Sequence, residues 1–399
     1  MERFGYQYNE QTNSFKIVDE PNGVLPHIVW HITDLCSLKC PFCFATKTQD
    51  EFDIALLDDY IQIFKKLGVQ RIDISGGEPL LYPNLDIVVD TLKSHGFYLT
   101  ITTSSVGNRR NKEWLITNAK KISWIIVSVD GHTKELHEAL RGKGTFESAI
   151  SFLNSLSKSN LRINSVVTKS FLEANTENMI MFIQTLPIKE WCLIMPSAVN
   201  MKPSFNDVCI NREDFDALLI SVKKMTSNKS NINVIHRYPE NYSGYWILYP
   251  NNKLILHNEN DCDKDIIIEF ESKNFDNIIN TITNQKIWLP MENKIEIKNT
   301  DENLFVSDLL KIALSVLESE RIKVNQKEKT ASGTKGVITT SIIIGIVTGV
   351  TANLITDAIK FAINKLKNRE DYSPNFKIEI NNTIIVLKDI ENSNINVDI

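Results

Sequence analysis

The stretch CSLKCPFCF (36–44) holds three cysteines, Cys36, Cys40 and Cys43, and Phe44 follows the last of them. The other three of the chain's 6 cysteines are far apart in the sequence. Four cysteines complete an ordinary iron–sulfur or structural zinc site, so three thiolates leave one metal coordination position open. An open position is typical of a metal that takes part in chemistry. A partial zinc site or three buried thiols are the alternatives.

A second motif lies about 32 residues further on, in SGGEPLL (75–81), directly after an expected strand, RIDIS (71–75). Glycine lets the backbone approach a ligand closely. A carboxylate can pair with an ammonium group. Gly76, Gly77 and Glu78 are therefore candidate ligand-binding residues, unless the stretch is only a turn.

Together, the Cys-x3-Cys-x2-Cys-Phe spacing and the later Gly-Gly-Glu-Pro resemble the signatures of the radical S-adenosylmethionine (radical SAM) enzymes. The resemblance implies that the cysteines hold three irons of a 4Fe–4S cluster and that SAM chelates the fourth. An electron donor such as flavodoxin or ferredoxin then drives cleavage of SAM to a 5′-deoxyadenosyl radical. The cofactor-binding residues that the resemblance implies in these two motifs are Phe42, Phe44, Gly76, Gly77 and Glu78, the last three at the amine of SAM.

Two further stretches resemble the family more weakly. ITTSS (101–105) stands where relatives often carry Thr-Asn-Gly, and Ser104 is a candidate cofactor contact although it departs from that pattern. SVDG (128–131) resembles the ribose-facing strand of the family, so the resemblance makes Ser128 and the later Arg141 candidates. The same four residues could instead simply end a strand with a turn.

Strand-like and helix-like segments alternate over the first 200 residues, which predicts parallel strands joined by helical crossovers. An eight-stranded barrel takes about 250 residues, so six units in about 170 residues favour an open, partial barrel. The expected fold class is α/β, a partial (β/α)6 barrel of the radical SAM type with an additional C-terminal α+β region. The predicted strands are 27–33, 71–75, 98–103, 124–130, 162–168 and 191–196, and the predicted helices lie near 54–68, 84–96, 111–120, 146–158 and 175–186.

The substrate is suggested by two stretches, RINSVV (162–167) and RYPENYSGYWILYPNNKL (237–254). Both resemble the viperin-like members of the family, which dehydrate a nucleotide in antiviral (antiphage) defence. The spacing within the second stretch is shorter here, and Asn252 replaces a glycine.

A nucleoside triphosphate needs fixed cations. Arg162, Lys169 and Arg237 are the candidates for this role. Asn164 could hold a ribose or base edge, and Tyr245 could supply a hydrogen atom or a proton. Ordinary surface cations and a core tyrosine are the alternative.

Two other functions stay open. Relatives that modify ribosomally made peptides commonly carry a C-terminal cysteine-rich domain, and Cys192, Cys209 and Cys262 are too dispersed to resemble one. The cluster could also serve a non-enzymatic iron–sulfur sensor, with the C-terminal region as its output module.

Composition restricts the class of protein and its partners. A net charge of −5 and a pI near 5.9 argue against a nucleic-acid partner. The N-terminal stretch lacks the apolar core of a signal peptide. We therefore expect a cytoplasmic protein whose clustered thiols stay reduced and free to bind metal.

The chain is expected to contain five segments: 1–27, an N-terminal extension; 28–200, the partial barrel; 201–298, the rest of the catalytic domain, covering the substrate site; 299–336, a helix and a polar linker; and 337–399, an accessory helix and a β-hairpin. The stretch 336–356 carries no charge, and its 21 residues are long enough to span a bilayer. A buried oligomerisation helix within 337–369 is the favoured interpretation, and membrane association through 336–356 is the alternative. The final stretch alternates around Asn381-Asn382, which predicts the hairpin.

Overall fold

The structure is a computed structural model, and the chain divides into two compact units. Unit 1 comprises residues 1–22 and 283–399, and unit 2 comprises residues 23–282. The structure describes residues 5–11, 14–18, 24–45, 48–156, 159–197, 203–226, 232–238, 246–258, 264–284, 294–299, 304–319, 324–330, 337–345, 350–380 and 383–387.

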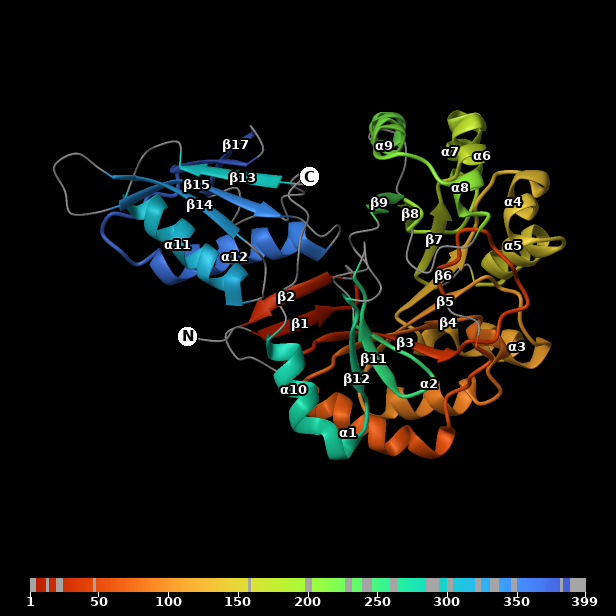
Figure 1. Ribbon diagram of the computed structural model, residues 1–399. Helices are drawn as coiled ribbons and strands as arrows, with labels where there is room; N and C mark the ends of the chain where they lie inside the picture. Colours follow the sequence, from red (N-terminus) through yellow and green to blue (C-terminus); the bar gives the residue numbers. More distant parts are fainter. Residues whose placement is uncertain are drawn as a thin grey trace. The chain divides into compact units, whose positions relative to one another are not determined.

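Unit 2 is built on a ten-stranded sheet with the order β12-β11-β10-β3-β4-β5-β6-β7-β8-β9 (Figure 1). The strands from β10 through β3 to β9 are all parallel to their neighbours, whereas β11 and β12 are antiparallel additions at one end. The bounds are β3 (His27–Thr33), β4 (Arg71–Gly76), β5 (Tyr98–Thr103), β6 (Trp124–Ser128), β7 (Leu161–Val166), β8 (Glu190–Ile194), β9 (Asn233–Arg237), β10 (Trp246–Leu248), β11 (Lys253–Leu256) and β12 (Ile266–Glu269).

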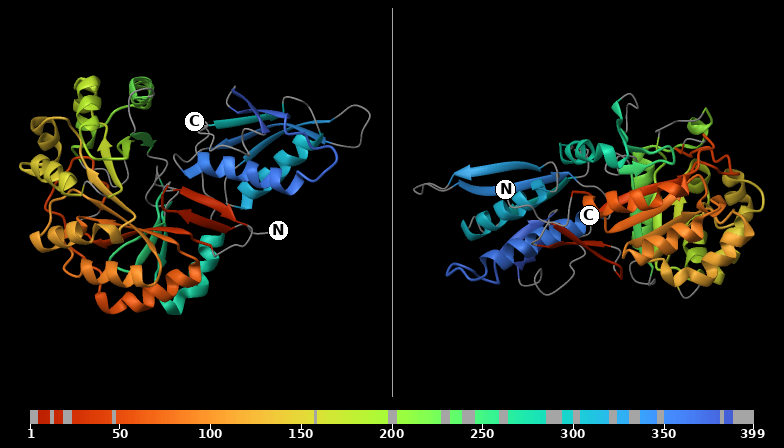
Figure 2. Two further views of the ribbon diagram at one scale, coloured as in Figure 1. Left: turned by 180° about the vertical axis from the view of Figure 1, so that it is seen from behind. Right: turned by 90° about the horizontal axis from the view of Figure 1, so that it is seen from below.

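The helices of unit 2 follow the outer side of this curved sheet (Figures 1 and 2). The predicted partial barrel is therefore confirmed, and its six expected strands are β3–β8. The sequence did not predict β9 and β10, which extend the parallel sheet at both ends. The bounds are α1 (Leu57–Leu67), α2 (Leu85–Ser94), α3 (Arg109–Asn118), α4 (Lys134–Arg141), α5 (Thr145–Ser155), α6 (Lys169–Glu173), α7 (Thr176–Gln184), α8 (Phe205–Val208), α9 (Arg212–Thr226) and α10 (Phe275–Asn284).

Helix α1 shows how the sequence fixes the outer layer. Its buried residues recur at helical spacing, and the helix ends at Gly68, whose φ of 76° suits glycine. Trp30 of β3 packs against this helix, with its ring centroid 5.7 Å from that of Tyr60 and 5.6 Å from that of Phe64. Because successive strand residues point to opposite faces, His31 lies on the concave face of the sheet.

The concave face is polar at the amino ends of the strands. Asp73 accepts from Arg71 Nε at 2.7 Å and lies 3.0 Å from His27 Nε2. Burial alone would raise the pKa of Asp73, but Arg71 and His27 hold it well below its usual range. This ion pair closes the floor of the barrel, opposite the edge at which the cysteine loop emerges from β3.

Unit 1 contains a hairpin of β1 (Gly5–Asn9) and β2 (Ser14–Val18) and a five-stranded sheet with the order β14-β15-β13-β16-β17. Helices α11 (Leu304–Ser319) and α12 (Val350–Leu366) pack together on one side of that sheet (Figure 2). The predicted C-terminal α+β region is thus present. The remaining bounds are β13 (Lys294–Asn299), β14 (Val324–Thr330), β15 (Val337–Gly345), β16 (Lys377–Ile380) and β17 (Thr383–Val386).

Three expectations for the tail need correction. The uncharged run predicted as one helix over 336–356 begins instead as strand β15, because β-branched residues such as its Ile, Val and Thr favour strands. The expected polar linker contains β14, which pairs with β15 along its length. The catalytic region ends near residue 282 rather than 298, and residues 1–22 belong to unit 1.

Two elements of unit 1 lie where the sequence predicts a helix and a hairpin. Helix α11 falls within the predicted 303–324 helical stretch, and Ile380 pairs with Thr383 across the predicted hairpin turn. Among the described residues, no helix is long and apolar enough to cross a membrane. Self-association through 337–369 stays a prediction.

Unit 2 holds the complete ten-stranded sheet, so a chain trimmed to residues 23–284 should fold alone. We expect soluble protein with cooperative thermal unfolding, measured by circular dichroism, and with SAM cleavage intact. A chain ending at Asn325 should aggregate, because it keeps β13 but lacks its partners β15 and β16, which leaves strand edges unpaired. Equal solubility of the two chains, or loss of SAM cleavage in the trimmed one, would contradict this division.

Candidate active site

The loop that leaves β3 carries the three cysteines. Cys40 is 6% exposed, and the backbone N–H of Cys43 donates to Cys40 O at 3.2 Å. Cys36 and Cys43 are partly buried. Burial raises the pKa of the Cys40 thiol, and the Arg141 guanidinium opposes this effect. The loop therefore holds the Cys40 thiol out of water but within reach of the positive charge of Arg141.

The surroundings of the loop are apolar. Leu38, Cys40, Phe42 and Leu140 form a buried cluster, and other hydrophobic residues pack against it from the neighbouring strand ends. Among the described residues, no three His, Cys, Asp or Glu side chains converge to hold a single metal ion. Three cysteine thiols on one loop fit a 4Fe–4S cluster, in which each thiolate binds its own iron. When bound, such a cluster supplies the electron for SAM cleavage.

The two glycines of the second motif lie against the root of this loop. A Cβ on Gly76 would stand 2.2 Å from Thr33 O, and a Cβ on Gly77 would stand 2.2 Å from Leu35 O. The backbone N–H of Gly77 donates to Thr33 O, and that of Glu78 donates to Leu35 O, both at 2.7 Å. The glycines are therefore required because two backbones meet here, and their contact with the SAM amine stays a prediction.

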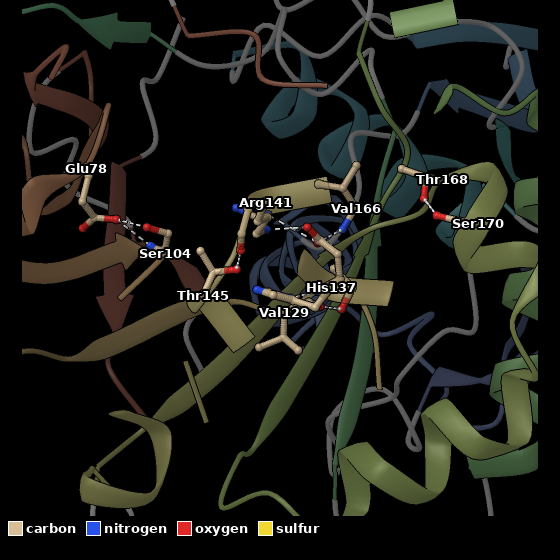
Figure 3. A network of polar contacts seen from close by, with 12 residues as sticks. Glu78, Ser104, Val129, His137, Arg141, Thr145, Val166, Thr168 and Ser170 are labelled. Atoms are coloured by element: carbon tan, nitrogen blue, oxygen red, sulfur yellow. Dashed lines mark hydrogen bonds and ion pairs between the residues drawn. The ribbon is translucent and has the colours of Figure 1, made fainter. Parts of the chain in front are cut away.

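Glu78 is 1% exposed and ties two strand ends together (Figure 3). Its Oε1 accepts from Thr103 Oγ1 at 2.5 Å and from Leu80 N at 3.1 Å. Its Oε2 accepts from Ser104 N at 2.7 Å and also from Ser104 Oγ. Burial raises the pKa of Glu78, and these hydrogen bonds act in the opposite direction. The four acceptor positions of the carboxylate are thus used within the protein, while the predicted contact with the SAM amine stays a prediction.

Ser104 and Ser105 stand where the resembled pattern has Asn-Gly. Ser105 adopts a φ of 66°, in the left-handed region that glycine occupies without strain. Its N–H donates to Thr103 Oγ1 at 2.8 Å, and its hydroxyl donates to Ser148 at 3.1 Å. These bonds hold the strained residue in place, so the departure from the pattern preserves the backbone turn.

Arg141 at the end of α4 connects the end of β6 with the cysteine loop, and Figure 3 shows it beside Val166. Asp130, which follows Ser128 at the end of β6, accepts from Arg141 Nε through Oδ2 and from Val166 N at 2.8 Å through Oδ1. The Arg141 guanidinium lies 5.4 Å from the ring centroid of Phe42. Asp130 is therefore more than a turn residue, because it fixes the arginine predicted to contact SAM.

A pocket of about 530 Å³ opens beside the cysteine loop. It lies between that loop, the segment after β5 and the N-terminal turn of α5. Four cationic residues and no acidic residue line it: Lys39, Lys112, Arg141 and Lys143. Because Asp130 pairs with Arg141, the charge that would attract an anionic group comes from the three lysines.

The structure places two predicted phosphate ligands elsewhere. Arg162 is buried and donates from Nε to Glu190 Oε2 at 2.7 Å, and its guanidinium lies 5.7 Å from the ring centroid of Trp124. This pair lies at the amino ends of β7 and β8, away from the cysteine loop. Lys169 Nζ donates to Asn206 O at 2.9 Å on the surface.

The other predicted substrate residues are Asn164, Arg237 and Tyr245, and the structure describes the first two. Asn164 lies on the concave face, 8% exposed, and its Oδ1 has no hydrogen-bond partner among the described residues. Arg237 ends β9, and its carbonyl accepts from Met195 N at 2.9 Å. Tyr245 lies outside the described residues.

The comparisons with known proteins agree with this geometry. The family model described as the radical SAM superfamily matches residues 30–183. An S-adenosylmethionine-dependent nucleotide dehydratase from Flammeovirga pacifica is 26% identical over 219 residues, 51% of this chain and 71% of that protein. A protein of the same name from Lacinutrix mariniflava is 28% identical over 184 residues, 42% of this chain but only 37% of that protein. Among solved structures, Streptococcus suis SuiB bound to S-adenosylmethionine has a TM-score of 0.52 at 20% identity, covering 68% of this chain and 67% of that one, which supports the fold alone.

A partial barrel with a three-cysteine loop locked by a Gly-Gly-Glu turn defines a site for radical chemistry on SAM. Residues 30–183 match the radical SAM superfamily, whose members use a 4Fe–4S cluster and SAM. The predictions of family, fold class and cofactors are therefore confirmed.

The first prediction for the site concerns Gly77. Gly77→Ala should abolish cluster incorporation, because the new methyl group would displace Leu35 O and with it the start of the cysteine loop. Iron and sulfide content and the visible absorbance after anaerobic reconstitution measure this. Gly96→Ala is the control, since its φ of 87° strains the backbone but its Cβ meets no atom within 4 Å. Equal iron content in the two variants would contradict the assigned role.

The second prediction uses two buried histidines. Burial lowers the pKa of His31 to about 3 and that of His137 to about 4, against an ordinary value of 6.5. The stability that each neutral ring contributes is full above pH 6.5 and is lost as the pH falls, because the unfolded chain then takes up the proton. Between pH 7.5 and 5.5 each should cost about 1.4 kcal/mol of unfolding free energy. The free energy of unfolding of the apo-protein, measured with urea, should depend less on pH in His31→Gln and His137→Gln than in the wild type. The exposed control His95→Gln should behave like the wild type. An equal pH dependence in all four proteins would show that the pKa values of His31 and His137 are not lowered.

Proposed function

We propose that this protein is a radical SAM enzyme that cleaves SAM reductively and dehydrates a nucleotide, in a viperin-like antiviral (antiphage) reaction in the cytoplasm. The observation that carries the proposal is a cysteine loop above a polar concave face. The names of two relatives support the same reaction class. A one-electron donor of the flavodoxin or ferredoxin class would reduce the cluster.

The concave face supports a polar substrate. His31 Nδ1, Thr100 Oγ1 and Asn164 Oδ1 are buried without hydrogen-bond partners in the described part of the chain. A buried polar atom left unsatisfied costs about 1–3 kcal/mol, so a ligand that bonds to it gains affinity. The hydroxyl groups and base edge of a nucleoside offer such bonds. Asn164 therefore keeps its proposed role, whereas Arg162 is tied to Glu190.

The pocket with four cationic residues supports an anionic cofactor or substrate group, either the carboxylate of SAM or a phosphate. Peptide modification is less well supported, because the sequence of unit 1, residues 1–22 and 283–399, contains no cysteine to bind an auxiliary cluster. Unit 1 remains the candidate for self-association.

The proposal predicts that one nucleoside triphosphate stimulates SAM cleavage. Anaerobically reconstituted protein is incubated with SAM, dithionite and each triphosphate in turn, and 5′-deoxyadenosine and the nucleotide lacking one water are measured by mass spectrometry. We expect 5′-deoxyadenosine to rise at least about tenfold with one triphosphate, and Cys43→Ala to abolish the product. SAM cleavage that no triphosphate stimulates would reject the nucleotide, and absence of cleavage from cluster-loaded protein would favour the sensor.

A further inference from the structure

Tyr249 and His257 are buried, and together with the partly buried Asp265 they form a chain of hydrogen bonds separate from the cofactor motifs. The Tyr249 hydroxyl lies 2.6 Å from His257 Nε2, and His257 Nδ1 lies 2.7 Å from Asp265 Oδ2. Asp265 Oδ1 accepts from the backbone N–H of Asn258 at 2.7 Å, which fixes the carboxylate. Because a carboxylate accepts, His257 Nδ1 donates to Asp265, and the opposite ring nitrogen, Nε2, pairs with the phenol.

The chain ends on the concave face, near the cysteine loop. Strand β10 is parallel to β3 with Leu248 opposite Trp30, so the next residue, Tyr249, lies beside His31. The ring centroids of Tyr249 and His31 are 4.9 Å apart. The His31 centroid lies 6.2 Å from that of Phe44, which directly follows the third cysteine. The phenol is therefore close to the place where the radical would act.

Tyr249 is 4% exposed, and the groups around it keep its proton in place. Burial first, and then the charges of Asp34 and Asp265, raise the pKa of Tyr249. The ring of His31 is neutral because burial lowers its pKa. Two polar atoms near the phenol, His31 Nδ1 and Asp34 Oδ1, are buried without a hydrogen-bond partner in the described part of the chain. These atoms mark the position of a polar ligand group.

We propose that Tyr249 is the catalytic proton donor to the hydroxyl group that leaves the substrate as water, with His257 and Asp265 as positioning residues. The inference rests on the proposed dehydration. In this step the carbon–oxygen bond of the substrate radical breaks, its electron pair stays on oxygen, and the phenol proton completes the water molecule. The substrate cation radical then gains one electron from the flavodoxin- or ferredoxin-class donor, which gives the unsaturated product. Tyr249 regains a proton from solvent.

The test compares Tyr249→Phe with a matched control, Tyr82→Phe. Tyr82 is also buried, and its hydroxyl donates to Phe52 O at 2.9 Å. In the full-length, cluster-loaded protein, Tyr249→Phe should keep the stimulation of 5′-deoxyadenosine by nucleotide. The dehydrated nucleotide formed per 5′-deoxyadenosine should fall about a hundredfold, the usual contribution of a general acid. Tyr82→Phe should leave this ratio unchanged.

The positioning residues are tested by the pH profile of the same ratio. His257→Gln changes the group that pairs with the phenol, and Asp265→Asn changes how that group is oriented, while Tyr249 itself remains. The pH profile of the ratio of dehydrated nucleotide to 5′-deoxyadenosine should therefore shift in both variants. The pH profile of Tyr82→Phe should match that of the wild type. An unchanged ratio in Tyr249→Phe would overturn the proposal. Loss of nucleotide stimulation in Tyr249→Phe with SAM cleavage intact would also overturn it, because Tyr249 would then only bind the substrate.

Failure of the proposed function gives a different result. If no triphosphate stimulates the wild type, dehydration is rejected, and the hydrogen-bonded chain is judged alone by proton NMR of the imidazole N–H of His257. A downfield signal that disappears in Asp265→Asn and moves in Tyr249→Phe would retain the Tyr–His–Asp unit as a proton relay for another substrate. A signal that does not respond to Tyr249→Phe would overturn the relay itself.

Discussion

Two backbone hydrogen bonds hold the candidate active site together, from Gly77 N to Thr33 O and from Glu78 N to Leu35 O. They join the turn after β4 to the backbone immediately before the first cysteine. No side chain could replace this contact, because any Cβ at Gly77 would overlap the partner carbonyl. Through its carboxylate, Glu78 extends the tie to Thr103 and Ser104 of the next strand end. Three consecutive parallel strands therefore set the position of the loop that carries the thiols.

The sequence predicted the central strands well because each is short, apolar and bounded by a turn or a helix. The metal-binding motif was equally predictable, since its cysteines are local in sequence. The purpose of Gly76 and Gly77 was not, because it depends on a backbone more than 40 residues away. Tyr249, His257 and Asp265 were missed for the same reason: their partnership arises only when β10, β11 and β12 pair at the edge of the sheet.

For Arg162 and for the tail, a local sequence pattern suggested a role before the residue or strand that pairs with it was known. Arg162 has the charge that a phosphate needs, but Glu190 at the start of β8 neutralises it inside the barrel. The uncharged stretch after residue 336 has the length of a membrane helix, but its Ile and Thr residues pair in register with β13 and β14. Composition alone does not separate a strand from a helix in such a stretch, whereas the pairing of β16 with β17 was predictable because a tight turn between two strands needs particular residues.

The two sides of the candidate site differ in polarity, and this difference suits two successive tasks. Around the cysteines, Leu38, Phe42 and Leu140 exclude water, which protects a radical and strengthens electrostatic interactions. On the concave face beside β3, polar atoms are buried next to a tyrosine held by a histidine and a carboxylate. An apolar wall can generate a radical safely but cannot move a proton, and removal of water from a substrate requires one. Tyr249, the proposed proton donor, therefore lies directly after β10, the strand neighbouring β3, outside the apolar cluster but on the concave face.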